Sequence, residues 1–138
     1  MNIRKMVIDD YENIYNLWKS IPSIGLYEDA DSKFGIEKYL TRNPNTCFVA
    51  ENDGKIIGAI LGGHDGRRGY INHTAVCSSE RNNGVGTALV NKVINALKQE
   101  GINRIAISVF KDNEEGNKFW ENRGFVLREN VIYRNKSM

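Results

Sequence analysis

Hydrophobic residues in the first third of the chain recur every three or four positions, which is the spacing of one helix face. The residues with this spacing are Ile14, Leu17, Trp18 and Ile21. They predict a helix over residues 9–20, after a first strand over residues 2–8. A second helix is expected over residues 31–42, because the proline at position 44 disfavours helical backbone at the residue before it.

From residue 47 onward the hydrophobic pattern indicates strands separated by turns. Residues 47–51 and 55–62 flank Asn52-Asp53-Gly54, a sequence typical of a tight hairpin turn. A further turn around residues 64–66 leads to a strand over residues 69–76. Three consecutive antiparallel strands are therefore expected in the middle of the chain.

The second half of the chain alternates helical and extended segments. The expected elements are a long helix that ends before Gly101, a strand over 104–110, a helix over 113–122, and strands over 124–127 and 131–133. The order β-α-α-β-β-β-α-β-α-β-β predicts an α/β (α+β) fold. We expect one domain over residues 1–138, with a mixed central sheet of about seven strands and helices on both faces.

Composition narrows the class of protein. The chain has 41% hydrophobic and 26% charged residues, which indicates a globular fold. Its net charge of +2 comes from scattered basic residues, so nucleic-acid binding is not expected. No apolar run has the length of a membrane span or the form of a signal peptide, so we expect a cytoplasmic protein. Cys47 and Cys77 are too few for a disulfide framework or a metal site.

The loop between the strand over residues 69–76 and the long helix has the features of an anion-binding site. The first turn of a helix offers backbone N–H groups without partners and the positive end of the helix dipole. Gly84 and Gly86 allow a ligand to approach closely, and Arg81 adds a positive charge suited to phosphate. This combination predicts a pyrophosphate site, although a glycine-rich turn that only starts a helix stays an alternative.

Two common phosphate-binding motifs do not fit this loop. A P-loop needs Lys-Ser/Thr after its last glycine, whereas Gly86 is followed by Thr87-Ala88. A dinucleotide-binding fingerprint needs a small residue at Leu89. The pattern Arg81-x-x-Gly84-x-Gly86 after a strand ending in Ala-Val instead resembles the pyrophosphate loop of the GNAT superfamily of acyl-coenzyme A N-acyltransferases.

A second motif near the C-terminus supports the same resemblance. Asn113 opens a helix, Trp120 follows seven residues later, and Gly124-Phe125 comes at eleven and twelve. The spacing is similar to that of the GNAT family, and the resemblance extends over nearly the whole chain. It implies an N-acetyltransferase that uses acetyl-CoA, needs no metal and acts on an amine of a small molecule or protein. A module that binds acyl-CoA with little turnover, as a sensor or regulatory partner, is the alternative. We expect a monomer or homodimer, because no sequence feature indicates a larger assembly.

The resemblance also implies where coenzyme A binds, between two diverging strands that end at Val76 and Phe110. Around the glycine loop it assigns the residues Val76, Cys77, Ser78, Arg81, Asn82, Asn83, Gly84, Val85, Gly86 and Thr87 to this ligand. From the second motif it adds Asn113, Gly116 and Trp120. Trp120 stands where the family often has a tyrosine that protonates the leaving thiolate, and an indole N–H is not an acid at useful pH. Tyr27, Tyr70 and Tyr133 are the possible substitutes.

The implied catalytic groups lie on the strand that ends at Val76. The backbone N–H of Val76 is the expected oxyanion donor, as is usual in the family. Strand alternation places Thr74, Asn72 and Tyr70 on one face, where Asn72 and Tyr70 are expected to hold a water that accepts the amine proton. His73 is the rival base, although its odd offset points it to the opposite face.

The acceptor site is expected in the loop over residues 23–31, together with the last strands. Glu28 or Asp29 of this loop could bind an ammonium group, and Trp18 and Tyr27 could form walls. Direct attack on the thioester is preferred to an acyl-enzyme on Cys77.

Overall fold

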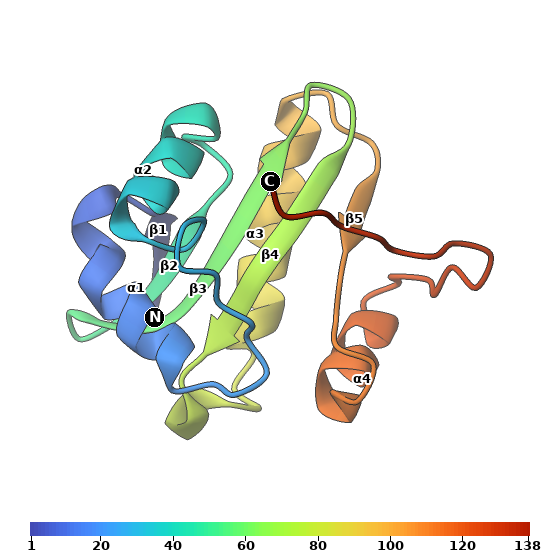
Figure 1. Ribbon diagram of the computed structural model, residues 1–138. Helices are drawn as coiled ribbons and strands as arrows, with labels where there is room; N and C mark the ends of the chain where they lie inside the picture. Colours follow the sequence, from blue (N-terminus) through green and yellow to red (C-terminus); the bar gives the residue numbers. More distant parts are fainter. The chain divides into compact units, whose positions relative to one another are not determined.

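The computed structural model describes all 138 residues, which form two compact units, residues 1–108 and residues 109–138. The strands of the first unit are β1 (Asn2–Lys5), β2 (Phe48–Asn52), β3 (Lys55–His64), β4 (Gly69–Val76) and β5 (Ile105–Ile107) (Figure 1). Its helices are α1 (Tyr11–Lys19), α2 (Lys33–Arg42) and α3 (Val85–Gln99), with short 3-10 turns η1 (Ile8–Asp10) and η2 (Ser78–Glu80). The second unit contains α4 (Glu114–Asn122). No helix of the chain is long and apolar enough to cross a bilayer.

The five strands form one sheet in the order β1-β2-β3-β4-β5. The first four pair antiparallel, and β5 pairs parallel to β4, which confirms the predicted mixed sheet. The turn between β2 and β3 places Asp53 at φ 51° and Gly54 at φ 75°. Two residues with positive φ are what a tight hairpin requires, so the turn predicted from Asn52-Asp53-Gly54 is confirmed.

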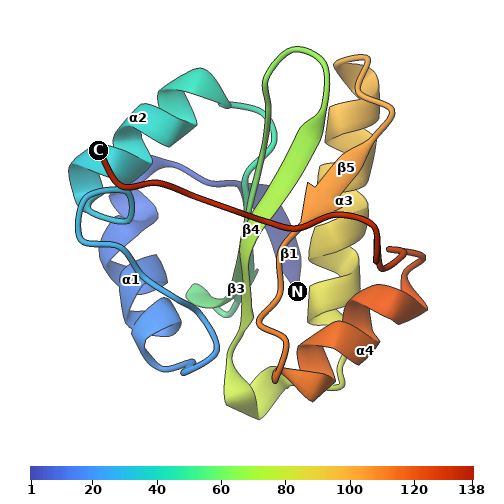
Figure 2. The same ribbon diagram turned by 45° about the vertical axis from the view of Figure 1, so that its right-hand side comes forward.

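Helices cover both faces of the sheet in the first unit, as predicted (Figure 2). On one face, Ile14 and Trp18 of α1 and Ile36 of α2 pack with Val49 and Leu61 of the sheet in the main hydrophobic cluster. The other face carries α3. A Cβ built on Gly58, Gly62 or Gly69 would lie against α3 side chains, so these three positions allow α3 to approach β3 and β4 closely.

The prediction of about seven strands is wrong, because the sheet has five. Residues 124–127 and 131–133 form no strand, and Val126, Leu127 and Ile132 are 79%, 80% and 75% exposed. Their alternating apolar pattern favours extended backbone, but a strand also needs a hydrogen-bonded neighbour. The unit formed by residues 109–138 contains no strand that could pair with them.

The first strand is also shorter than the predicted range over residues 2–8, because an acidic side chain turns the chain after Lys5. Asp10 accepts hydrogen bonds from the Val7 N–H at 2.9 Å and from both terminal nitrogens of Arg4 at 2.7 and 2.8 Å. Burial raises the pKa of the Asp10 carboxyl, but these hydrogen bonds together lower it more, so its net pKa lies below the usual value.

We expect Asp10→Asn to lower the free energy of unfolding at neutral pH by about 1.5–3 kcal/mol, the contribution of a hydrogen bond to a charged group. A carboxyl with a lowered pKa in the folded state stabilises fully above its unfolded pKa of about 3.9 and loses this effect as the pH falls. Urea unfolding at pH 7 and at pH 3 should therefore show a difference between the two proteins that shrinks in acid. A difference that stays constant between the two pH values would contradict the role given to the Asp10 carboxylate.

Candidate active site

One edge of β4 is left open by the neighbouring strand. β5 pairs only with Gly69, Tyr70 and Ile71, at the beginning of β4. The remaining residues of β4, from Asn72 to Val76, have no β5 residue beside them. Buried or partly buried backbone groups need hydrogen-bond partners, so this open edge is suited to a ligand that carries amide groups. The strand expected to end at Phe110 ends at Ile107, and β4 continues for five residues beyond the last one paired with β5.

The N–H group of Val76 points toward this open edge. On the other side of β4, Cys77 N–H donates to Ile57 O at 2.8 Å, and Val76 lies opposite Gly58. Because backbone groups in an antiparallel pair point alternately toward and away from the neighbouring strand, the N–H and C=O of Val76 point away from β3. The Arg81 Nε donates to Val76 O at 3.4 Å from that side.

A β-bulge interrupts the alternation of β4 at His73 and Thr74. Ala59 lies opposite Ala75 and Leu61 lies opposite Asn72, so two residues of β4 face the single residue Ile60 of β3. His73 has φ 44°, a value uncommon for residues other than glycine. The extra residue shifts the register of β4 by one. Residues on the N-terminal side of the bulge therefore face the opposite side of the sheet from the side expected by counting back from Val76.

The prediction that His73 points to the opposite face from Asn72 and Tyr70 is therefore wrong. Its Nε2 lies 2.7 Å from Asp31 Oδ1, and its ring packs edge-on against Trp18 of α1, with centroids 4.8 Å apart. Both contacts lie on the face covered by α1 and α2. Trp18 is fully buried there, so it belongs to the core and forms no pocket wall.

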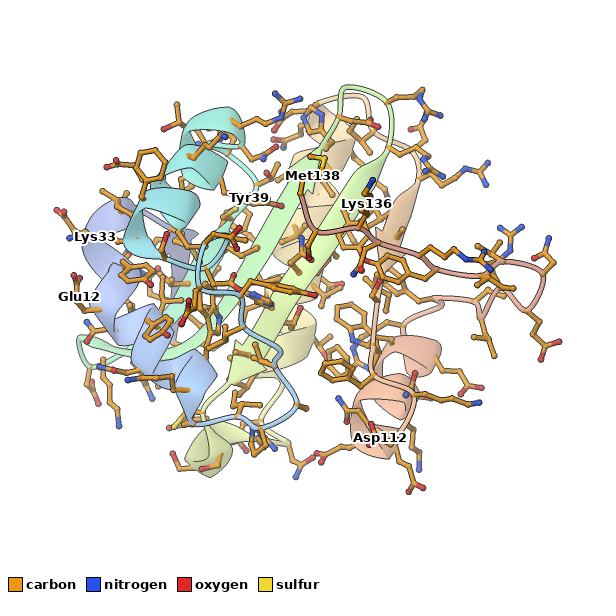
Figure 3. The ribbon with its side chains drawn as sticks, in the orientation of Figure 1. Glu12, Lys33, Tyr39, Asp112, Lys136 and Met138 are labelled. Atoms are coloured by element: carbon orange, nitrogen blue, oxygen red, sulfur yellow. The ribbon has the colours of Figure 1, made fainter.

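Asn72 and Tyr70 face the same two helices. Asn72 lies next to the phenol of Tyr39 of α2, and Figure 3 shows Tyr39 extending from α2 toward the sheet. Burial raises the pKa of the Tyr39 phenol well above its usual value, so it stays protonated. Tyr70 Oη makes a hydrogen bond with Ser108 Oγ just after β5. Thr74, which was expected on the same face of the strand as Asn72 and Tyr70, lies in the bulge, and its hydroxyl is buried without a hydrogen-bond partner.

The glycine loop leads directly from β4 into α3. Gly84 is the N-cap residue of α3 and has φ 81°, and Asn82 has φ 66°. The helix begins at Val85, and Ala88 N–H donates back to Gly84 O at 3.0 Å. The N–H groups of the first helical turn have no acceptor inside the helix, as at any helix start. The predicted combination of glycines, a helix N-terminus and a nearby Arg81 is thus present in one segment, and the structure adds the positive φ of Asn82 and Gly84.

Cys77 and Ser78 connect β4 to this loop through η2. The Cys77 thiol is partly buried and lies 3.3 Å from the Ser79 hydroxyl, a contact that lowers the pKa of the thiol. Cys47 is buried in the core, where burial raises its pKa to about 12. Neither thiol forms a disulfide, and no group of three His, Cys, Asp or Glu side chains is placed to hold a metal ion.

The second motif folds as a capped helix in the unit of residues 109–138. Asn113 is the N-cap of α4, and its Oδ1 accepts the Gly116 N–H at 2.9 Å. A Cβ at Gly116 would collide with the Asn113 side chain, so glycine is needed for this cap geometry. Trp120 is 9% exposed and packs edge-on against Phe119 and Phe125.

The loop between α1 and α2 forms a hollow of about 400 Å³. It is lined by Tyr11, Tyr15, Leu26, Tyr27, Glu28, Asp31, Ser32 and Lys33. Tyr27 and Glu28 line it as the acceptor-site hypothesis requires, whereas Asp29 caps the neighbouring Ala30 N–H at 2.8 Å. Lys33 pairs with Glu12 at 3.2 Å on the outside of the two helices (Figure 3). The last strands, over residues 124–127 and 131–133, were expected to form the rest of the acceptor site, but these residues form no strand.

Three polar residues that lie against β4 were not predicted from the sequence to do so, namely Asp31, Tyr39 and Ser108. Asp31 reads as the start of a helix, and 42 positions separate it from His73 in the sequence. Tyr39 lies on a helix whose pattern indicates only an apolar face. No local signal marks the contacts of Asp31 and Tyr39 with β4, because those contacts are created by the packing of α2 and its preceding loop on the sheet. The contact of Ser108 with Tyr70 depends on the pairing of β5 with β4.

Comparisons with known proteins agree on one family. The model of the acetyltransferase (GNAT) family matches residues 11–125. The chain is 28% identical over 138 residues to an acetyltransferase of Sodalis glossinidius, covering 100% of this chain and 96% of that protein.

Solved structures of this family share the fold. Ard1 from Thermoplasma volcanium matches with a TM-score of 0.82 and 24% identity, over 92% of this chain and 83% of that one. The PaiA N-acetyltransferase from Thermoplasma acidophilum, determined in complex with coenzyme A, matches with a TM-score of 0.80 and 20% identity, over 94% and 92% of the two chains.

Proposed function

Because the chain belongs to the acetyltransferase (GNAT) family, we propose that it transfers an acetyl group from acetyl-CoA to an amine of a small molecule or protein. The observation that carries this proposal is the open edge of β4, where the Val76 N–H points outward just before the glycine loop at the start of α3. Under this proposal, residues 1–138 act as one N-acetyltransferase domain.

Coenzyme A binding is the first step of the proposed reaction. The pyrophosphate would accept hydrogen bonds from the backbone of the glycine loop and the first turn of α3, with the helix dipole and Arg81 supplying positive charge. The residues proposed for this contact are Cys77, Ser78, Arg81, Asn82, Asn83, Gly84, Val85, Gly86 and Thr87. The pantetheine arm would pair with the backbone of Val76 along the open edge, as an added strand does.

The second motif contributes proposals of its own. Asn113 uses its Oδ1 to cap α4, which leaves its side-chain NH₂ group as the donor for the pantetheine arm. We propose the same ligand for Gly116 and Trp120. The fold of a relative that was determined with coenzyme A supports this assignment.

The chemical step makes three demands on the site. The amine must lose a proton, the oxyanion formed at the thioester carbonyl needs a donor, and the thiolate must leave. The outward Val76 N–H is proposed as the oxyanion donor. The proton acceptor is proposed on β4, either as a water held by Tyr70 and Asn72 or as His73. With Trp120 in place of an acid, the thiolate leaves without a dedicated proton donor, which a thiol pKa of about 8.5 permits near neutral pH.

An acyl-CoA-binding module without turnover is the second candidate function. Its support is the indole of Trp120, which cannot act as an acid, and the lack of a carboxylate among the residues of β4. A thiol-release assay with acetyl-CoA and a panel of polyamines, aminoglycosides, amino acids and peptides separates the two.

We expect at least one amine of this panel to raise thiol release above the rate of hydrolysis without acceptor. The product should be the acetylated amine, identified by mass spectrometry, at one equivalent per thiol. Tight binding of coenzyme A without release for any acceptor would favour the binding module. Absence of coenzyme A binding would contradict both candidates.

A further inference from the structure

The chain has two histidines, and the Nε2 of each donates a hydrogen bond to a carboxylate. His64 pairs with Glu100 at 2.9 Å, between the end of β3 and the end of α3. His73 pairs with Asp31 at 2.7 Å, inside the bulge of β4. The two pairs have similar geometry, but only the second lies on the strand that carries the proposed oxyanion donor. His64 and Glu100 therefore provide a control within the same molecule.

Asp31 is a buried carboxylate with all its polar groups engaged. The residue is 5% exposed, and its Oδ1 contacts His73 while its Oδ2 accepts the Tyr27 N–H at 2.8 Å. Its backbone carbonyl accepts the Tyr11 hydroxyl at 2.6 Å. Asp31 thus fixes the loop that precedes α2 and contacts β4 through the same side chain.

The partner of Nε2 determines which nitrogen of His73 has a free lone pair. A carboxylate only accepts hydrogen bonds, so Nε2 of His73 carries the hydrogen in the neutral ring. The lone pair is then on Nδ1, which has no hydrogen-bond partner within residues 1–108. The His73 side chain keeps 18% of its surface exposed, so it can be reached by a small molecule or a water.

The backbone conformation of His73 also indicates that its contact with Asp31 has a function. A φ of 44° in a residue with a side chain costs energy and persists only where the surroundings hold it. The contacts with Asp31 and Trp18 supply that support. They orient an imidazole three residues before Val76, next to the open edge of β4.

We propose that His73 accepts the proton of the attacking amine at Nδ1, and that Asp31 is the positioning residue that keeps the hydrogen on Nε2. This inference rests on the proposed function. The acceptor ammonium gives a proton to Nδ1, and its nitrogen then forms a bond to the thioester carbonyl carbon, whose oxygen becomes the oxyanion; the C–S bond breaks as the carbonyl re-forms. The second proton of the nitrogen goes to the departing thiolate, and the imidazolium returns its proton to solvent.

The variant Asp31→Asn tests this arrangement directly, because Asp31 provides two acceptor oxygens and an amide provides one. If the amide oxygen keeps the Tyr27 N–H, the NH₂ group faces His73 and favours the tautomer with hydrogen on Nδ1. We expect kcat to fall about 100-fold, within the range for loss of a general base, while KM for acetyl-CoA stays within about twofold. In the 15N NMR spectrum of the histidine ring, the hydrogen of His73 should move from Nε2 to Nδ1.

The control variant is Glu100→Gln, which makes the same chemical change at His64. It should alter the His64 ring signals and leave kcat unchanged. His73→Gln should lower kcat by at least about 100-fold, and His73→Gly should recover activity when imidazole is added, which a purely structural role would not produce. Circular dichroism spectra and coenzyme A binding identify any variant that fails to fold. If a variant fails to fold, the 15N NMR spectrum of the unaltered protein tests the proposal, because it shows whether Nε2 or Nδ1 of His73 carries the hydrogen.

Different results would overturn the two proposals. If the unaltered protein transfers acetyl groups and the variants at Asp31 and His73 keep its kcat, the role given to this pair is wrong and the proposed function stands. Hydrogen on Nδ1 of His73 in the unaltered protein would also overturn the role given to Asp31 and His73. If the unaltered protein releases no thiol with any amine, the proposed function and the role of the pair both fail.

Discussion

Replacing Gly84 with valine should weaken coenzyme A binding about 100-fold while the protein still folds. Gly84 has φ 81° at the N-cap of α3, a backbone conformation that costs a β-branched residue about 1–3 kcal/mol. A Cβ at this position would meet nothing within 4 Å, so the effect comes from the backbone and not from a collision. The loop must change its course, and the N–H groups of the first turn of α3 lose their alignment. A 100-fold change corresponds to about 2.8 kcal/mol, which is within the range of about 1.5–3 kcal/mol for loss of one hydrogen bond to a charged ligand.

Isothermal titration calorimetry with coenzyme A measures this effect, and the chain offers a matched control. Gly54 also has a positive φ, 75°, and open space around its Cβ position, but it lies in the hairpin between β2 and β3. Gly54→Val should lower the free energy of unfolding by a similar amount and leave coenzyme A binding unchanged. Equal affinity in Gly84→Val and the unaltered protein would show that the pyrophosphate binds elsewhere.

Replacing Trp18 with alanine should cause the largest loss of stability of any change considered. Trp18 is fully buried in the cluster that joins α1 and α2 to the sheet. Removing such a ring leaves a cavity and costs about 3–5 kcal/mol of the free energy of unfolding. That is a large part of the total stability of about 5–15 kcal/mol that is typical of a protein domain, so the variant should be close to unfolded at 37 °C.

Urea unfolding followed by circular dichroism measures the loss, with Trp18→Phe as the milder comparison. The indole N–H of Trp18 is buried without a hydrogen-bond partner, so phenylalanine removes an unsatisfied donor along with part of the ring. Trp18→Phe should therefore cost clearly less than Trp18→Ala. A loss below about 1 kcal/mol for alanine would contradict the packing of α1 on the sheet.

Local signals in the sequence were sufficient for most of the fold. The hairpin turn at Asp53-Gly54 could be predicted because both residues tolerate positive φ, and the helix start at Gly84 because glycine and asparagine precede a long helical pattern. The two C-terminal strands could not be judged in this way. Their pattern describes each segment alone, whereas a strand exists only with a partner.

The candidate site was predictable in its backbone and not in its side chains. The open edge of β4 was expected from the family resemblance, and the loop before α3 from its glycines and the helical pattern that follows them. The bulge at His73 and Thr74 leaves no mark in the alternating pattern of β4, because one extra residue changes the faces without changing the composition. The Asp31–His73 contact depends on that bulge and on the path of a loop whose conformation its own sequence does not determine.

Under the proposed function, the hydrogen bonds of Asp31 have a consequence for how such a protein changes its acceptor over evolution. The same carboxylate fixes the Tyr27 backbone in the loop and the ring of His73 on the strand. An insertion or deletion between residues 21 and 30 that reshapes the loop for a new acceptor would also displace this carboxylate. Selection for a new acceptor would then lower the turnover number at first, and substitutions at the loop and at position 73 should arise together in the lineages that recover it.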